Sequence, residues 1–258
     1  MSALNRAYAM TFASFEEVKP ISPGDAVGAV QIRRAKNYFD FYLATVTEYA
    51  TTLAGFLREH GVDTPLTHNS AGTVINSHFL ETVEALGNKN FLVGSDHYYN
   101  LGQTWAQNNP TPQYAANIFI SLEMLRLMGF PPTAMEMPSG SGSDWPPVTA
   151  GDCKACYWTN LAFGMKGNNF YIFTGGPNPP GAVNTTDVYD DGAPVGAKNE
   201  IRPLYYAQKE LGIFLKISPW LEESEREADC RFAFDFECPR TDAYWKNPGE
   251  FLVTGTTA

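Results

Sequence analysis

Residues 131–147 read PPTAMEMPSGSGSDWPP, and this stretch sets a pattern that the rest of the chain repeats. A short apolar run, TAMEM (133–137), is bounded by Pro and Gly, as expected of a buried strand. Its one carboxylate, Glu136, is near the end of the run and is followed by a flexible Ser/Gly segment. The spacing of apolar residues over 151–165 then predicts a helix. The stretch therefore predicts a strand, a polar loop and a helix in succession.

Three more strands of this kind are predicted. They are TPLTHNS (64–70), FLVGSDHYY (91–99) and NNFYIFTGG (168–176), and further helices are predicted over 38–60, 114–130 and 201–217. Alternating strands and helices are typical of parallel β/α units, and in a (β/α)8 barrel the residues after each strand form the active-site face. The candidate site residues are therefore the polar residues that follow the strands: Asn69, Asp96, His97, Tyr98, Glu136 and Asn178.

The number of strands predicts an incomplete barrel. A complete (β/α)8 barrel needs eight strands in about 250 residues, and the pattern yields four. We therefore expect an α/β fold of the TIM-barrel type, with residues 1–218 forming the second, C-terminal half of the barrel. The chain changes character after that point, because CRFAFDFECP (230–239) alternates like a strand. Residues 219–258 are predicted to begin a β-rich accessory domain.

Composition and charge restrict the class of partner. The 258 residues carry a formal net charge of -10 with only 18 Lys and Arg. Nucleic acids and anionic membrane surfaces require clustered basic residues, so neither is expected as a partner. No apolar run approaches the roughly 20 residues that span a bilayer, and the N-terminus lacks the apolar core of a signal peptide. The default expectation is a cytoplasmic protein that acts on a neutral substrate.

Four cysteines leave three interpretations open. Cys153 and Cys156 form a CxxC pair, whereas Cys230 and Cys238 are more widely spaced. The two pairs could bind zinc, the second pair could form a disulfide, or all four could be inert thiols. Inert thiols are the default, because the second pair lacks the spacing of a metal knuckle and the first lies at the start of a predicted helix. No metal or cofactor is predicted.

Several segments carry a family resemblance and occur in the family's order along the chain. LNRAYAMTFASFEEVKP (4–20), TPLTHNS, GSDHYY and MEMPSGSGSDWPP are similar to segments of glycoside hydrolase family 42. FYIFTGGPNPPG and TTDVYDDGAP are similar to segments of family 35. Residues 1–216 thus resemble the retaining β-galactosidases of these two families, whose catalytic domains are (β/α)8 barrels. The resemblance implies a β-linked galactoside, or a related oligosaccharide, as the substrate.

The resemblance also implies roles for single residues. Glu136 matches the nucleophile, the carboxylate that attacks the anomeric carbon and forms a glycosyl-enzyme intermediate. Trp145 would stack on one face of the sugar, while Tyr171 and Tyr189 would lie near the nucleophile and the sugar hydroxyls. Other polar residues at the strand ends would bind hydroxyl groups: Asn69, Asp96, Tyr98 and Asn178.

His97 is expected to have a different role from its neighbour Asp96. Successive side chains of a strand point to opposite faces, so the ring of His97 is predicted to turn away from Asp96 and to pack in the interior.

The chain departs from the family pattern at the general acid/base. In the family this residue is a Glu preceded by Asn, in a strand of the form QxENE. The segment AVGAVQIRRAK (26–36) contains Gln and Ile but continues with two Arg. We therefore expect the acid/base to lie upstream of Met1, and the chain to need an oligomer or a complementing N-terminal half.

Two other classes of protein remain open. The chain could be a non-catalytic carbohydrate-binding or remnant barrel protein that has kept the residues of the pocket. It could also be an unrelated α/β enzyme, in which Asp96 and His97 act together or the CxxC pair binds zinc.

Overall fold

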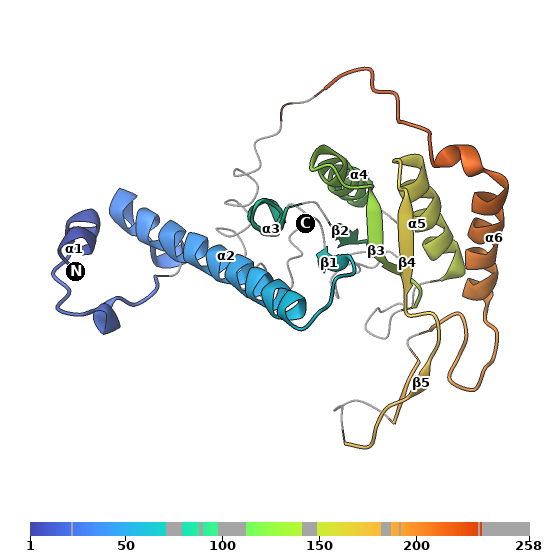
Figure 1. Cartoon of the computed structure of the whole chain (residues 1–258), viewed down its shortest axis with the longest axis horizontal. Helices are drawn as coiled ribbons and strands as arrows, with labels where there is room; N and C mark the ends of the chain where they lie inside the picture. Colours follow the sequence, from blue (N-terminus) through green and yellow to red (C-terminus); the bar gives the residue numbers. More distant parts are fainter. Residues whose placement is uncertain are drawn as a thin grey trace. The chain divides into compact units, whose positions relative to one another are not determined.

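The computed structural model describes residues 1–21, 23–70, 79–87, 90–97, 112–140, 149–181, 187–190, 192–231 and 233. They belong to two compact units, which we describe separately (Figure 1). The first unit contains helices α1 (Ser2–Tyr8), α2 (Gly28–Glu59) and α3 (Phe79–Leu86), and the 3-10 helices η1 (Phe15–Glu17) and η2 (Pro23–Asp25). The second contains the remaining elements, apart from the first residue of β1 and of β2. They are β1 (Leu66–Ser70), β2 (Phe91–Asp96), α4 (Pro112–Leu127), β3 (Thr133–Pro138), α5 (Ala150–Ala162), β4 (Gly167–Tyr171), β5 (Gly176–Pro177), β6 (Val188–Tyr189), α6 (Pro203–Ile217) and η4 (Pro219–Leu221).

Helix α2 is the main element of the first unit and begins at Gly28, upstream of the predicted start at residue 38. Its buried residues Ala35, Phe39 and Leu43 are four positions apart, so they lie on one face of the helix. The helix ends at Glu59, and Gly61 follows with a positive φ of 81°, as at many helix C-termini. No described helix is both long and apolar enough to cross a membrane.

The second unit is built on a four-stranded sheet with the order β1-β2-β3-β4. Strand β2 pairs in parallel with β3, and β3 pairs in parallel with β4. All four strands and the helices α4, α5 and α6 occur where the sequence predicted them, with ends that differ by a few residues. Strands in chain order with helices between them form part of a (β/α)8 barrel, which confirms the predicted fold class.

The core of the second unit lies between the sheet and helices α4, α5 and α6. Ala134 and Met137 of β3, with Ile118, Tyr157 and Leu211 from the three helices, belong to one cluster of buried side chains. Helix α5 is held at its start by a capping box, because the Thr149 hydroxyl accepts from the backbone N–H of Asp152 and the Asp152 carboxylate accepts in return.

Strand β3 contains one extra residue relative to both of its neighbours. Ser95 of β2 pairs with Ala134, but the next residue, Asp96, pairs with Glu136. The register with β4 shifts within the same part of β3, between Ala134 and Met137. Ala134 and Met137 both belong to the helix-covered core although they are three positions apart. The irregularity is a β-bulge, and it leaves the Glu136 side chain on the opposite face, next to Asp96.

Strands β2 and β3 approach each other closely at Gly94. A β-carbon at this position would lie 2.3 Å from Met135 Cγ and 2.8 Å from the carbonyl oxygen of Thr133. Only glycine fits between the two strands there, immediately before the residues that pair with Ala134 and Glu136.

The chain between β4 and α6 differs from its prediction. Strand β4 ends at Tyr171, whereas the pattern predicted a strand to residue 176. The polypeptide continues into β5 and β6, which pair antiparallel with Gly176 opposite Tyr189. Of the predicted β-rich segment, 219–258, the described part contains the 3-10 helix η4, and residues 234–258 lie outside the described residues.

Candidate active site

Three of the predicted site residues come together at the carboxyl ends of adjacent strands. Asn69 is the penultimate residue of β1, Asp96 ends β2, and Glu136 lies near the end of β3. The Asn69 amide nitrogen donates to both carboxylate oxygens of Asp96, at 3.1 and 3.0 Å, and to Oε1 of Glu136 at 3.1 Å. A single amide group thus bridges two carboxyl groups that lie side by side on adjacent strands.

The environment of Asp96 raises its pKa to about 7. Burial is the main cause, since the side chain is almost inaccessible to solvent, and the nearby charge of Glu136 adds to it. The hydrogen bond from Asn69 acts in the opposite direction. Near neutral pH Asp96 therefore exists in both the protonated and the ionised form, beside a second carboxyl group that it faces across the sheet.

The backbone around Glu136 is held from both neighbouring strands. The amide of His97 donates to the Glu136 carbonyl oxygen at 2.8 Å. On the other side, the Asn169 side chain in β4 donates to the carbonyl oxygen of Met135 at 3.1 Å. The bulged part of β3 is therefore anchored despite its irregular register, and the carboxylate projects from a fixed backbone.

His97 faces away from the carboxyl pair, as strand alternation predicted. Its ring is buried in the interior, where Nε2 lies 2.6 Å from Ser95 Oγ and Nδ1 contacts Oδ1 of Asn160. Burial lowers the pKa of His97 to about 4, although the Asn160 contact acts in the opposite direction. The imidazole is therefore neutral at physiological pH, and this geometry gives no support to a catalytic pair formed by Asp96 and His97.

Asn160 was not among the predicted residues. It lies on α5 within a polar group buried under the sheet, and its amide nitrogen donates to the carbonyl oxygen of Cys156 at 3.0 Å. The only signal in the sequence is an Asn four residues after Cys156 in an otherwise apolar helical pattern. Such a residue positions the interior histidine and does not face the carboxyl pair.

The remaining predicted residues lie at the end of β4, in the segment that follows it, or outside the described residues. Tyr171 ends β4, where its carbonyl oxygen accepts from the Ser139 amide at 3.1 Å, and its side chain is half exposed. Asn178 and Tyr189 belong to the segment after β4; the Asn178 amide donates to the Asp187 carbonyl oxygen at 2.9 Å. Tyr98 and Trp145 fall outside the described residues.

The cysteines of the CxxC pair lie in the hydrophobic core. Cys153 and Cys156 are on α5 and are buried against the sheet, whereas Cys230 is exposed and Cys238 is outside the described residues. Within the described ranges, no three His, Cys, Asp or Glu side chains are grouped so that they could hold a metal ion.

The fold is that of part of a (β/α)8 barrel, and Asp96 and Glu136 lie at the carboxyl ends of its strands, the edge at which such barrels place their active sites. A family model described as beta-galactosidase, glycoside hydrolase family 42, matches residues 1–179, and the chain belongs to this family.

Known proteins similar to the chain include a glucosyltransferase and a beta-galactosidase. A beta-1,2-glucosyltransferase of Ignavibacterium album is 27% identical over 189 residues, which cover 69% of this chain and 25% of that protein. The crystal structure of the beta-galactosidase from the psychrophilic Marinomonas ef1 matches with a TM-score of 0.58 and 15% identity. That match covers 96% of this chain and 39% of the other, and it shows a common fold alone. The chain spans about a quarter of the glucosyltransferase's length.

Proposed function

We propose that the chain carries the nucleophile half of a retaining β-galactosidase, with Glu136 as the nucleophile. The observation that supports this most directly is the bridge from Asn69 to both Asp96 and Glu136 at the carboxyl ends of neighbouring parallel strands. In barrels of this type the reacting groups come from those strand ends. Membership of a beta-galactosidase family supplies the reaction class.

In this proposal the two carboxyl groups have different roles. Glu136 attacks the anomeric carbon, the bond to the leaving oxygen breaks, and a glycosyl-enzyme ester forms. Asp96, whose pKa is raised to about 7, holds a proton for part of the time at neutral pH and so limits repulsion beside the nucleophile. The Asn69 amide orients the Glu136 oxygen, and the sugar hydroxyls contact Tyr98, Tyr171, Asn178 and Tyr189, with Trp145 stacked against the ring.

A retaining glycosidase also needs a carboxylic acid that protonates the leaving oxygen, about 5 Å from the nucleophile. By the family pattern we place this group on a strand that precedes the segment 4–20, in a complementing N-terminal half. General acid catalysis typically contributes about 10²–10⁴-fold to the rate. Substrates with poor leaving groups therefore need that half, whereas substrates with good leaving groups do not.

This difference gives a direct test of the nucleophile. A 2,4-dinitrophenyl glycoside has a leaving group that departs without protonation, and a fluorine at C2 of the sugar slows hydrolysis of the ester. Incubation of the chain with 2,4-dinitrophenyl 2-deoxy-2-fluoro-β-galactoside should add one fluorogalactosyl group to the peptide that contains Glu136, as mass spectrometry would detect. Glu136→Gln should form no adduct. An adduct on any other carboxylate would refute the assignment.

The same experiment separates the alternative of a non-catalytic carbohydrate-binding protein. That alternative predicts binding of a galactoside with no release of dinitrophenol and no adduct. The glucosyltransferase relationship adds a second comparison, in which the matching fluoroglucoside is used. Faster labelling by the glucoside would assign the chain to glucosyl rather than galactosyl substrates, with Glu136 in the same role.

A further inference from the structure

The chain between β4 and α6, residues 172–202, leaves the end of the sheet and returns to it at α6. We call this segment the excursion. Its two arms are joined near the base, where the Gly175 amide donates to the Val195 carbonyl oxygen at 2.9 Å and the Val195 amide donates to the Phe173 carbonyl oxygen at 3.1 Å. Beyond this base, β5 and β6 pair with each other. The excursion carries Asn178 and Tyr189, two of the residues proposed to contact the sugar.

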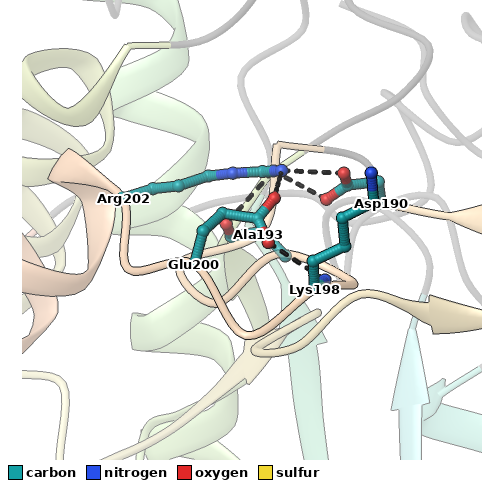
Figure 2. A network of polar contacts seen from close by, with 5 residues as sticks. All are labelled: Asp190, Ala193, Lys198, Glu200 and Arg202. Carbon is teal, nitrogen blue, oxygen red and sulfur yellow. Dashed lines mark hydrogen bonds and ion pairs between the residues drawn. The ribbon is translucent and has the colours of Figure 1, made fainter.

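Arg202, at the start of α6, is the centre of a polar network in this excursion (Figure 2). Its guanidinium donates to both carboxylate oxygens of Asp190, at 2.6 and 2.7 Å, and to Oε1 of Glu200 at 2.6 Å. The second oxygen of Glu200 accepts from the Lys198 amide at 3.0 Å. A two-pronged Arg–carboxylate contact fixes orientation as well as distance, which a single ionic contact does not.

Arg202 is the least exposed of the three ion-paired side chains in the network. Its side chain is 26% exposed, whereas those of Asp190 and Glu200 are 39% and 45% exposed, and those of the Lys154–Glu210 pair in the same unit are 43% and 53% exposed. The hydrogen bond from Arg202 is the main cause that lowers the pKa of Asp190. Isolated exposed pairs contribute little to stability, so Lys154–Glu210 serves as a matched comparison.

Asp190 connects this network to a proposed sugar-binding residue. Tyr189 precedes it directly and pairs with Gly176, and a β-carbon on Gly176 would lie 2.8 Å from the Tyr189 hydroxyl oxygen. The Tyr189 ring therefore packs directly on the backbone of Gly176, and any side chain at position 176 would clash with it. An arginine that fixes Asp190 also fixes the backbone from which this tyrosine projects.

The turn after Asp190 lies close to the chain that follows β3. A β-carbon on Gly192 would be 3.9 Å from the α-carbon of Gly140, which follows the end of β3. The backbone beside Gly192 is held as well, because the Ala193 amide donates to the Asp190 carbonyl oxygen at 2.8 Å. The turn that contains Asp190 thus contacts the chain four residues after Glu136.

We propose that Arg202 is a positioning residue for the sugar site. Its hydrogen bonds to Asp190 and Glu200 hold the excursion in one conformation. In that conformation Tyr189 and Asn178 bind the galactoside beside Glu136. The inference rests on the proposed function, since it assigns a purpose to residues that the proposed site includes. Arg202 itself contacts neither the sugar nor the reacting atoms.

The test is the affinity for isopropyl β-thiogalactoside, which is not hydrolysed, measured by titration calorimetry on the full chain. Arg202→Ala should raise the Kd by about 10-fold or more, and Arg202→Lys should recover little, because an ammonium group cannot form the two-pronged contact. Lys154→Ala should leave the Kd unchanged. Thr149→Ala, which removes the N-cap of α5 and so destabilises the protein at another place, should also leave the Kd unchanged. A loss of affinity in the Thr149 variant equal to that in Arg202→Ala would reduce Arg202 to a stabilising role and overturn the inference.

A second variant keeps the test decisive if Arg202→Ala does not fold. Asp190→Asn removes the charged partner with little change in volume, and it should raise the Kd to a similar extent. Both substitutions break the same contact, that between Arg202 and Asp190. The Kd of the double variant Arg202→Lys/Asp190→Asn should therefore be no higher than the larger of the two single-variant Kd values. Additive losses would contradict a joint action of the two residues. Wild-type protein that does not bind the thiogalactoside would contradict the proposed function itself, whereas normal binding by Asp190→Asn would contradict only the role of Arg202.

Discussion

Asp96 and Glu136 are paired across two parallel strands and accept hydrogen bonds from one amide nitrogen, that of Asn69. Burial is the main cause that raises the pKa of Asp96 to about 7, and the nearby charge of Glu136 adds to it. In the proposed function, Asp96 holds a proton for part of the time at neutral pH, and Glu136 is the nucleophile. The predictions below test these roles and the strand geometry behind them.

Removal of the bridging amide should change both the rate and its pH dependence. Asn69→Ala takes away charge-assisted hydrogen bonds to both carboxyl groups, and such bonds typically contribute about 1.5–3 kcal/mol. We expect hydrolysis of 2,4-dinitrophenyl β-galactoside to fall about 10- to 100-fold. The hydrogen bond lowers the pKa of Asp96, so its loss should move the pH limb of the profile that belongs to Asp96 upward. The control is Asn169→Ala, which removes an amide that donates to the Met135 carbonyl oxygen and should leave the pH limb of Asp96 in place. If the limb also stays in place in Asn69→Ala, the hydrogen bonds from Asn69 to the two carboxyl groups do not act as proposed.

The buried Asp96 should make stability depend on pH in a predictable direction. Its pKa is raised from 3.8 to about 7, so folding favours the protonated form. The resulting stability is fully present below about pH 4 and is lost as pH rises toward about 7. Asp96→Asn should abolish this loss, and the free energy of unfolding of the variant relative to wild type should increase by up to about 4 kcal/mol across that interval. Urea denaturation at several pH values measures it. A constant difference between the two proteins would contradict the raised pKa.

His97 should contribute with the opposite sign over an overlapping range. Its pKa is lowered from 6.5 to about 4, so folding favours the neutral ring. The associated stability is present above about pH 6.5 and is lost as pH falls through about 4, by up to about 3 kcal/mol. The direct measurement is the chemical shift of the His97 ring carbon Cε1 as a function of pH, with His97→Gln used to assign the signal. A midpoint near 6.5 would show that the ring is not buried as described.

The close approach of β2 and β3 should not tolerate a side chain at Gly94. In Gly94→Ala the new methyl group would meet Met135 Cγ and the carbonyl oxygen of Thr133, and the second atom belongs to the backbone and cannot easily move. We expect a loss of about 3 kcal/mol in the free energy of unfolding, as for other overpacked sites. Gly212→Ala in α6 is the matched control. It has no atom within 4 Å of the new methyl group, and it should be more stable by about 0.5–1 kcal/mol. Equal effects of the two substitutions would contradict the strand packing.

Local sequence patterns predict the order of the elements well. Alternating apolar runs and helical spacing locate β1 to β4 and helices α4, α5 and α6, because each of these elements buries one face and that burial leaves a period in the sequence. The same reasoning places Asn69, Asp96 and Glu136 at one edge of the sheet. It does not find α3, an eight-residue helix too short to show a clear period, nor the early start of α2.

The relationships that depend on register are not visible in the sequence. Strict alternation through TAMEM would place Glu136 on the same face as Ala134, toward the helices. The structure instead places it opposite, because a bulge changes the register with β2 and β4. The Arg202 network was also missed, since it joins residues through a long excursion whose path has no period. Contacts of this kind are set by tertiary packing rather than by local pattern.

The bulge in β3 reverses which face of the sheet the following side chains point to. This affects how related chains should be aligned. A strand that is one residue shorter at Met135 could present the same core side chain and the same carboxylate to the same faces with no bulge at all. We therefore expect that relatives can differ by a one-residue gap immediately before the position of Glu136, the proposed nucleophile, while keeping the orientation of its side chain. A one-residue gap at this position in an alignment is therefore compatible with an unchanged orientation of the carboxylate.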